Sequence, residues 1–213
     1  MGNRLSAIAT RTGDDGTTGL GDGTRTAKDA LRVQAMGDVD ELNSTIGLLL
    51  TEDLPDDVAR DLFDIQHDLF DLGGELSIPG FTLLKPEQVL RLDEWLARYN
   101  APLPALREFI LPGGSRAAAL AHVSLPARRH SILPVGPRAV ALAHVARTVC
   151  RRAERSVVSL EANEPINDTL RHYLNRLSDL MFVLARTLNR VNGGNDVLWR
   201  SERNARAAAA DQD

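Results

Sequence analysis

Residues 170–191 read LRHYLNRLSDLMFVLARTLNRV, and apolar side chains recur in this stretch every three or four positions. This spacing places them on one face of an α-helix, because the helix repeats every 3.6 residues. The members of this stripe are Leu170, Leu174, Leu177, Met181, Leu184, Leu188 and Val191. An apolar face of this length has to be buried against other elements, so the stretch predicts one helix of a packed bundle.

Four more segments have the same spacing, and each predicts a further helix. Their apolar positions are Ala35, Val39, Leu42, Ile46 and Leu49; Val58, Leu62, Ile65, Leu69, Leu72 and Leu76; Val89, Leu92, Leu96 and Tyr99; and Leu142, Val145, Val149, Ala153, Val157 and Leu160. Pro55, Pro86 and Pro165 stand near expected helix starts, and Gly193 with Gly194 ends the last helix. The pattern predicts an all-α fold, an antiparallel five-helix bundle.

The size and charge of the chain narrow its class. The 213 residues fit one domain, 1–213, in which about 203–213 is expected to be a flexible tail. A net charge of −4 argues against nucleic acid as a partner. No apolar run is long enough to span a membrane. Cys150 is the single cysteine, which excludes an intramolecular disulfide and favours a reducing, cytoplasmic location.

An N-terminal arm, residues 1–27, lies outside the predicted helices. It contains the stretch ATRTGDDGTTGLGDGTRTAKD at residues 9–29, where glycines alternate with threonines between Arg11, Arg25 and Lys28. Glycine lets backbone N–H groups converge, while threonine hydroxyls and basic side chains add donors and charge for a polyphosphate. No GxxxxGK[ST] motif is present. The residue types leave two readings open, a phosphate-binding arm and a flexible arm without a ligand.

A basic cluster lies in ARTVCRRAERSVV, residues 146–158. On a helix, Arg147, Arg151 and Glu154 fall within about 60° of one another, whereas Arg152 points elsewhere. Two arginines one turn apart can bind phosphate while Glu154 orients one of them. The alternative is a solvated face of weak i,i+4 ion pairs.

Several polar residues interrupt the apolar stripes. Asn175 and Asp179 share a face of the last helix, where a buried edge demands a hydrogen-bond partner. Asp40 in the first helix suggests an ion pair with an arginine of another helix. His122 and His144 have no Cys or carboxylate at ligand spacing, so no metal site is predicted from them.

One segment of the chain is duplicated. Residues 109–123 read FILPGGSRAAALAHV and residues 131–145 read SILPVGPRAVALAHV. The first copy keeps Phe109 and the PGGS loop, while the second has PVGP and alone runs into the arginine cluster. We therefore expect about 115–136 to be a duplicated insertion and the arginine helix to begin near Pro137.

Taken together, these stretches resemble the PduO-type ATP:cob(I)alamin adenosyltransferases. The pieces that carry the resemblance are TRTGDDGTTGLGDG followed by Lys28, then GDVDELNSTIG, FDLGGELSIP, FILPGGS, ARTVCRRAER and NRLSDLMFVLAR. They occur in the order of the family and cover nearly the whole chain. The resemblance implies a five-helix bundle that assembles as a homotrimer, with ATP and the corrinoid bound between neighbouring subunits.

The resemblance also implies roles for individual residues. Those implied for the nucleotide site are Thr10, Arg11, Thr12, Gly13, Thr18, Gly19, Lys28, Arg151, Arg152, Glu154, Arg155 and Asn175. Arg147 would pair with Asp40, either within a chain or across a subunit interface. Phe109 would close the corrinoid pocket and exclude the lower axial ligand, and Mg²⁺ would bind to the phosphates.

The implied reaction needs no protein nucleophile, because Co(I) of cob(I)alamin attacks C5′ of ATP and triphosphate leaves. The protein would supply position and positive charge, with Arg151, Glu154 and Phe109 as its catalytic residues. Implied partners are a cytosolic cob(II)alamin reductase and an enzyme that uses adenosylcobalamin. A binding protein without efficient turnover and a purely structural bundle are the alternatives. Cobalamin versus cobinamide, and synthesis versus salvage, stay open.

Overall fold

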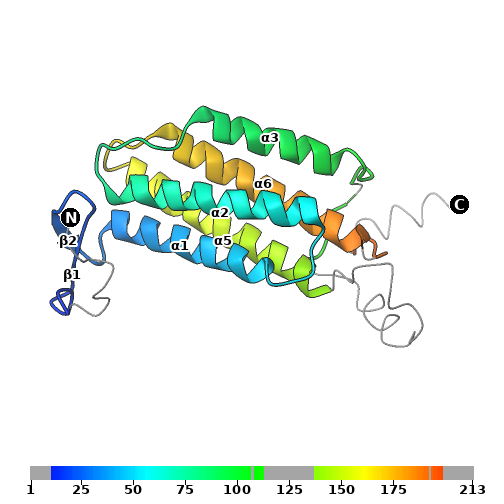
Figure 1. The fold of residues 1–213 in the computed structure, drawn as a ribbon, viewed down its shortest axis with the longest axis horizontal. Helices are drawn as coiled ribbons and strands as arrows, with labels where there is room; N and C mark the ends of the chain where they lie inside the picture. Colours follow the sequence, from blue (N-terminus) through cyan, green and yellow to red (C-terminus); the bar gives the residue numbers. More distant parts are fainter. Residues whose placement is uncertain (1–10, 107, 113–136, 192, 199–213) are drawn as a thin grey trace, which may run out of the picture.

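The computed structural model describes residues 11–106, 108–112, 137–191 and 193–198, and helices dominate it (Figure 1). The helices are α1 (Leu31–Leu49), α2 (Asp56–Ser77), α3 (Pro86–Asn100), α5 (Pro137–Glu161) and α6 (Asp168–Val191). Two short strands, β1 (Thr17–Gly19) and β2 (Arg25–Ala27), form an antiparallel hairpin in the arm. The predicted all-α, five-helix fold is confirmed. None of the described helices has the length and apolar character that crossing a membrane requires.

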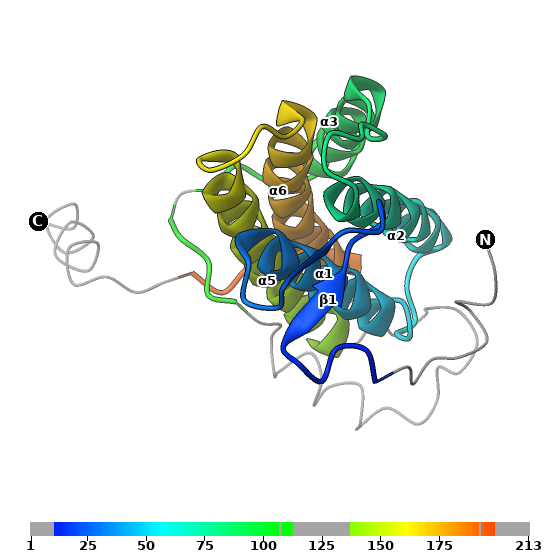
Figure 2. The same ribbon diagram turned by 90° about the vertical axis from the view of Figure 1, so that its left-hand side faces the viewer.

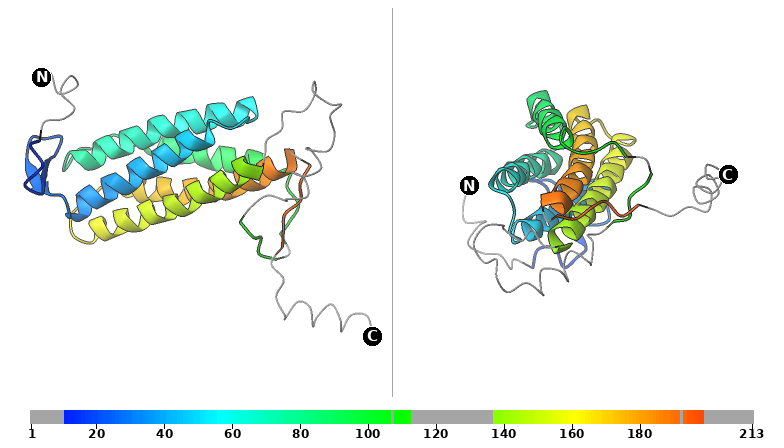
Figure 3. Two further views of the ribbon diagram at one scale, coloured as in Figure 1. Left: turned by 90° about the horizontal axis from the view of Figure 1, so that it is seen from below. Right: turned by 90° about the vertical axis from the view of Figure 1, so that its right-hand side faces the viewer.

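The helices lie lengthwise beside one another, and successive ones reverse direction along the chain (Figures 1 and 3). α5 packs against both α1 and α6, α2 packs against α1, and α3 packs against α6. One continuous hydrophobic core joins them. α5 therefore lies in the middle of the bundle, and two of its sides are buried against neighbouring helices.

The predicted stripes of α1, α2 and α6 form this core, except that Val191 at the end of α6 is exposed. The stripe predicted for α5 is wrong at Val145, which is 48% exposed. The buried face of α5 is instead rich in small side chains. Its members are Ala139, Val140, Ala143, Ala146, Val149, Cys150, Ala153, Val157 and Leu160. Small residues let α5 approach α1 and α6 closely.

Buried carboxylates on α2 fix α3 and α6 in place. Tyr99 on α3 donates a 2.7 Å hydrogen bond from its hydroxyl to Asp61, which also pairs with Arg98. Tyr173 on α6 donates a 2.8 Å hydrogen bond to Asp68. Burial, together with the neighbouring carboxylate, raises the pKa of both tyrosines. These bonds satisfy charges that would otherwise be costly to bury.

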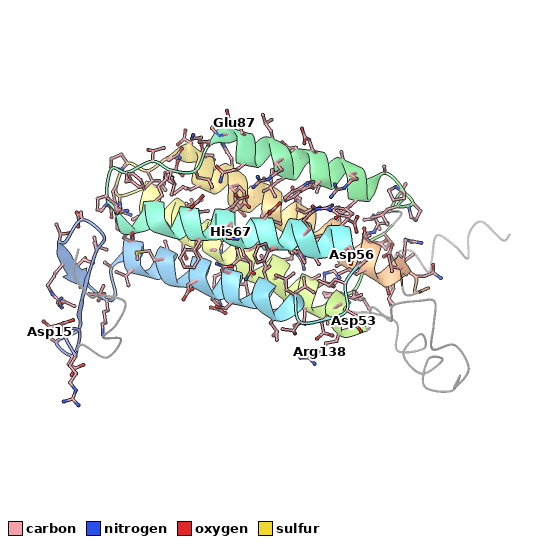
Figure 4. The ribbon with its side chains drawn as sticks, in the orientation of Figure 1. Asp15, Asp53, Asp56, His67, Glu87 and Arg138 are labelled. Carbon is pink, nitrogen blue, oxygen red and sulfur yellow. The ribbon has the colours of Figure 1, made fainter. Side chains whose placement is uncertain are left out.

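The two ends of the bundle carry different features. Asp15 of the arm lies at one end, and Asp53 and Arg138 lie at the other (Figure 4). The hairpin sits beyond the start of α1, as Figure 2 shows from that side. It is attached through the backbone N–H of Gly21, which donates to the carbonyl of Ser77 over 2.7 Å. The predicted insertion, about 115–136, and the tail, about 203–213, lie outside the described residues.

Candidate active site

Four arginines differ from every other described arginine, because no described carboxylate lies within 4.0 Å of them. They are Arg11, Arg147, Arg151 and Arg155. All the remaining described arginines form such ion pairs. A guanidinium without a carboxylate partner keeps its charge available for an anionic ligand. All four are residues that the sequence or the family resemblance assigns to the site.

Three of these arginines form a row along α5. Arg147, Arg151 and Arg155 are spaced by four residues and so follow one side of the helix. Arg151 and Arg155 are exposed, whereas Arg147 is half-buried and its Nε has no hydrogen-bond partner among the described residues. Burial, and next the charge of Arg151, lower the pKa of Arg147. The row is a concentration of positive charge that an anion would stabilise.

Arg152 is the exception within this cluster. Its Nε lies 3.1 Å from Asp38 Oδ1, and its Nη2 pairs with Glu41. The hydrogen bond from Arg152 is the main reason that the pKa of Glu41 is lowered. Ser156 also donates to Asp38, over 2.5 Å. Arg152 therefore joins α5 to α1 within one chain, and the nucleotide contact implied for it stays a prediction.

Glu154 and Asn175 come together from different helices. Nδ2 of Asn175 on α6 donates to Oε1 of Glu154 on α5 over 3.0 Å. The amide oxygen of Asn175 accepts a 3.1 Å bond from Arg176. The predicted hydrogen-bond partner is found for Asn175, whereas the prediction of a buried edge is wrong for Asp179, which is exposed and lies 4.0 Å from Arg176. Glu154 forms no ion pair with a described arginine, so it does not orient one within this chain.

Asp40 and Arg147 are not paired within the chain. Asp40 is exposed on α1 and lines a hollow of about 460 Å³ between α1 and α2, together with Gly37, Gly73 and Phe70. Arg147 lines a different hollow, together with His144 and Phe182. The two side chains face separate surfaces, so the predicted ion pair is open only to a second copy of the chain.

Two aspartates that the sequence analysis passed over shape the arm. Oδ1 of Asp15 accepts hydrogen bonds from the backbone N–H and the hydroxyl of Thr17, at 2.9 and 2.7 Å. Asp22 accepts the same pair from Thr24, at 2.8 and 2.7 Å. These bonds lower the pKa of both carboxyls. The aspartates are turn-forming residues, and the Asp-x-Thr spacing is the signal that identifies them.

The basic residues of the arm divide into two roles. Arg25 is occupied by the arm itself, because its guanidinium donates to the carbonyl of Thr12 over 2.5 Å and to the hydroxyl of Thr17. Lys28 forms no ion pair with a described residue, and its ammonium lies beside Gly13. A Cβ on Gly13 would come within 3.0 Å of Lys28 Nζ and 3.1 Å of the Thr17 carbonyl. Glycine therefore leaves room there for the ammonium of Lys28, which a Cβ would displace slightly.

The rest of the predicted phosphate loop is extended or strained. Arg11 has a φ of 57°, a left-handed conformation that is uncommon outside glycine. Thr18 and Gly19 lie in β1, opposite Thr26 and Arg25 of β2. Thr10 lies outside the described residues. The arm is thus a hairpin, which the sequence did not predict, because strands of three residues have no readable alternation.

Phe109, in the segment between α3 and α5, is 76% exposed. It lines a hollow of about 560 Å³ whose wall includes Leu106, Ile110, His144, Arg147 and Phe182. Phe182 packs edge-on to His144, with ring centroids 6.3 Å apart. The sequence analysis did not single out Phe182, although it follows Met181 in the NRLSDLMFVLAR motif. The hollow combines a largely apolar wall with Glu108 and with Arg147, which forms no ion pair with a described carboxylate.

The arm lies at the end of the bundle where α1 begins, whereas α5 begins at the opposite end and runs toward the arm (Figures 1 and 4). Arg147 lines the Phe109 hollow, while Arg151 and Arg155 are one and two turns nearer the arm. No hydrogen bond or ion pair joins the described part of the arm to the row. The described residues of one chain therefore do not bring the predicted loop and the arginines into contact.

The chain is similar in sequence to proteins of one family. The family model described as cobalamin adenosyltransferase matches residues 8–125 and 123–188, two pieces that meet within the duplicated segment. A cobalamin adenosyltransferase of Cupriavidus metallidurans is 64% identical over 204 residues, covering 95% of this chain and 99% of that protein. A corrinoid adenosyltransferase of Bacillus subtilis is 44% identical, covering 89% and 90%.

Solved structures of the same kind of enzyme are also similar to this chain. A variant PduO-type ATP:corrinoid adenosyltransferase from Lactobacillus reuteri, complexed with cobalamin and ATP, superposes with a TM-score of 0.77. It is 32% identical and covers 91% of this chain and 99% of its own. Another variant of that enzyme, complexed with ATP, has a TM-score of 0.75 at 34% identity, covering 91% of this chain and 100% of its own.

Proposed function

We propose, on the premise that the chain belongs to the cobalamin adenosyltransferase family, how its own residues carry out adenosyl transfer. The chain is an ATP:corrinoid adenosyltransferase, which transfers the 5′-deoxyadenosyl group of ATP to cob(I)alamin. The Co–C5′ bond forms with the electron pair of Co(I), the C5′–O bond of ATP breaks, and triphosphate leaves with the bonding electrons. The products are adenosylcobalamin and triphosphate.

The α5 row is the part of this chain that we assign to the triphosphate. Negative charge grows on the leaving oxygen in the transition state, and fixed cations stabilise it at no reorganisation cost. Arg151 and Arg155 have no carboxylate partner among the described residues, whereas Arg152 does. This contrast between neighbouring arginines is the observation that carries the proposal. Glu154 and Asn175 border the row and would bind the nucleoside.

The arm would enclose the phosphates from the other side. Lys28 supplies a cation beside Gly13, and Arg11, Thr12, Thr18 and Gly19, with Thr10 before them, supply donors. Arg25 holds the loop in shape rather than contacting the ligand. We expect the arm to close on ATP through backbone N–H groups as much as through side chains.

The corrinoid would occupy the hollow that Phe109 borders. An apolar wall containing Phe109 and Phe182 disfavours a polar lower axial ligand, and loss of that ligand makes cobalt easier to reduce to Co(I). Arg147 lies in the same wall and is one turn from Arg151. Cobalt and C5′ would therefore meet along the Arg147–Arg151 part of α5.

A homotrimer with sites between subunits would bring the separated parts together. The hollow between α1 and α2, with Asp40 at its edge and Phe70 77% exposed, is the surface that we assign to a neighbouring chain. Gly37 and Gly73 would allow close approach, because no side chain covers the backbone there. Asp40 of one chain would pair with Arg147 of the next.

The remaining partners follow from the chemistry. Mg²⁺, when bound, would neutralise phosphate charge; no group of three or more His, Cys, Asp or Glu in the described residues forms a ready metal site, so the phosphates would be its main ligands. A cob(II)alamin reductase would supply Co(I), and an adenosylcobalamin-dependent enzyme would accept the product. A reducing cytoplasm suits this chemistry and the free, buried Cys150.

An anaerobic assay separates this proposal from a binding protein without turnover. Purified chain would be mixed with MgATP and chemically reduced cob(I)alamin, and both adenosylcobalamin and triphosphate would be measured. Equal amounts of the two products are expected. ATP binding without either product would leave only the binding-protein alternative.

A further inference from the structure

Phe109 stands in a segment whose backbone is bonded to residues of α6 and beyond its end. Its side chain is 76% exposed, so it gains little from burial in the chain. A side chain that acts as a wedge has to be held where the substrate meets it, since a displacement of about 1 Å can cost a large part of the rate. The question is which residues hold the segment that carries Phe109.

Asp196, beyond the end of α6, is bound by two arginines of that helix. Nε and Nη2 of Arg186 each lie 3.1 Å from Oδ2 of Asp196, and Nη2 of Arg190 lies at the same distance. The side chains of Arg186 and Asp196 are 4% and 8% exposed. This buried ion pair fixes residues 195–198 against the last turns of α6.

The same arginine reaches the segment that leads to Phe109. Nη2 of Arg186 donates a 2.8 Å hydrogen bond to the carbonyl oxygen of Pro104. Arg186 thus connects residues 195–198 to the segment that follows α3. Because Arg186 is buried, its guanidinium cannot exchange these partners for water without a large cost.

Beyond Phe109 the two segments form backbone bonds. Ile110 pairs with Leu198 in an antiparallel bridge, and the N–H of Leu111 donates to the carbonyl of Val197 over 2.7 Å. Phe109 therefore lies between two attachments, at Pro104 and at residues 110–111, and both lead to Asp196 or its immediate neighbours. The segment 195–198 is the support on which the Phe109 segment rests.

We infer that Asp196 is a positioning residue, which through Arg186 and the backbone of residues 197–198 holds Phe109 over the corrinoid hollow. This inference deepens the proposed function and rests on it. Asp196 touches no substrate; it acts by fixing where Phe109 stands, and so sets how completely the lower axial ligand is excluded from cobalt.

The test measures the axial ligand directly. Cob(II)alamin would be bound to the enzyme with MgATP, and electron paramagnetic resonance would give the ratio of cobalt without an axial nitrogen to cobalt with one, from the nitrogen superhyperfine splitting. Variants are Asp196→Asn, Phe109→Ala and the double variant. Leu111→Pro removes the N–H that bonds Val197 and leaves every charge in place, so it serves if Asp196→Asn folds poorly.

We expect Asp196→Asn to lower this ratio by about ten-fold, because it removes one charge-assisted hydrogen bond. Leu111→Pro should lower the ratio as well. In the Phe109→Ala background, Asp196→Asn should change nothing further, because the two substitutions act through one side chain. Asp61→Asn is the control, since it weakens the ion pair of another buried aspartate, on the α2–α3 side. It should lower the melting temperature and leave the ratio unchanged.

Two results would overturn the inference. One is an unchanged ratio in Asp196→Asn and Leu111→Pro while Phe109→Ala lowers it, which leaves the proposed function standing. The other is an equal further loss when Asp196→Asn is added to Phe109→Ala, because additivity means independent effects. An unchanged ratio in Phe109→Ala itself would instead contradict the corrinoid pocket of the proposed function.

Discussion

Asn175 of α6 holds the carboxylate of Glu154 of α5 through a hydrogen bond of 3.0 Å. The amide of Asn175 is itself held by Arg176. Glu154 therefore has a fixed orientation beside Arg151 and Arg155, although it pairs with neither. A carboxylate fixed in this way suits the neutral hydroxyl or amino groups of a nucleoside better than it suits phosphate.

Removing this bond should weaken nucleotide use. We expect Asn175→Ala to lower kcat/KM for ATP by about ten-fold, because a hydrogen bond to a charged group is worth about 1.5–3 kcal/mol. Steady-state kinetics at saturating corrinoid would measure it. Asn163→Ala removes an exposed asparagine just beyond the end of α5, whose side chain donates to the carbonyl of Ser159, and should leave the rate unchanged. Equal losses in both variants would mean that general helix damage explains the effect.

The unpaired arginines should matter more than the paired ones. We expect Arg151→Ala to lower turnover by at least ~100-fold, because it removes charge that stabilises the leaving triphosphate. Arg138→Ala is the control on the same helix; this arginine is exposed and pairs with Glu52 over 3.1 Å. Turnover by Arg151→Ala close to that of the control would contradict the assignment.

A single methyl group should disturb the arm. Gly13→Ala places a Cβ within 3.0 Å of Lys28 Nζ and 3.1 Å of a backbone carbonyl, so the ammonium has to move. We expect the Kd for ATP to rise by about ten-fold while the melting temperature stays within a few degrees, because the site is at the surface. Isothermal titration with ATP and thermal unfolding would measure the two effects. Unchanged ATP affinity would remove Gly13 from the site.

His144 should make stability depend on pH. Burial, and next the charge of Arg147, lower its pKa from 6.5, while Asp196 acts in the opposite direction. Below about pH 6.5 the unfolded chain therefore binds a proton more readily than the folded chain does. The free energy of unfolding falls as the pH falls below this value, and the full contribution to stability is present above it. The slope of the free energy of unfolding against pH, measured by urea unfolding between pH 5 and 8, should be shallower in His144→Gln than in the wild type. An unchanged slope would contradict this prediction.

The helices could be predicted from the sequence where large apolar residues mark the buried face. The stripe from Leu170 to Leu188 is an example, because leucine has a strong preference for burial and the period is clear. α5 shows the limit of this approach. Its buried face includes Ala139, Ala143 and Ala146, which the predicted stripe left out because alanine is a weak signal, whereas the stripe included the exposed Val145.

The site could be predicted less completely, for a different reason. Arg151 and Arg152 are neighbours of the same type, and helical geometry separates their directions but not their partners. Only the packing of α1 against α5 shows that Asp38 and Glu41 take up Arg152. The support of Phe109 by Asp196 depends on contacts between distant segments, which periodicity and motifs do not report.

The central claim is that the arm of one chain and the α5 row of another form each site, and subunit mixing tests it most directly. Lys28→Ala and Arg151→Ala chains would be purified, mixed in equal amounts under conditions that exchange subunits, and assayed for adenosylcobalamin. If each site takes its arm from one chain and its row from a neighbour, random mixing restores both residues in about a quarter of the sites, and activity rises to about that fraction of wild type. Activity no greater than the average of the two parent variants, despite verified exchange, would show that both residues serve the same chain.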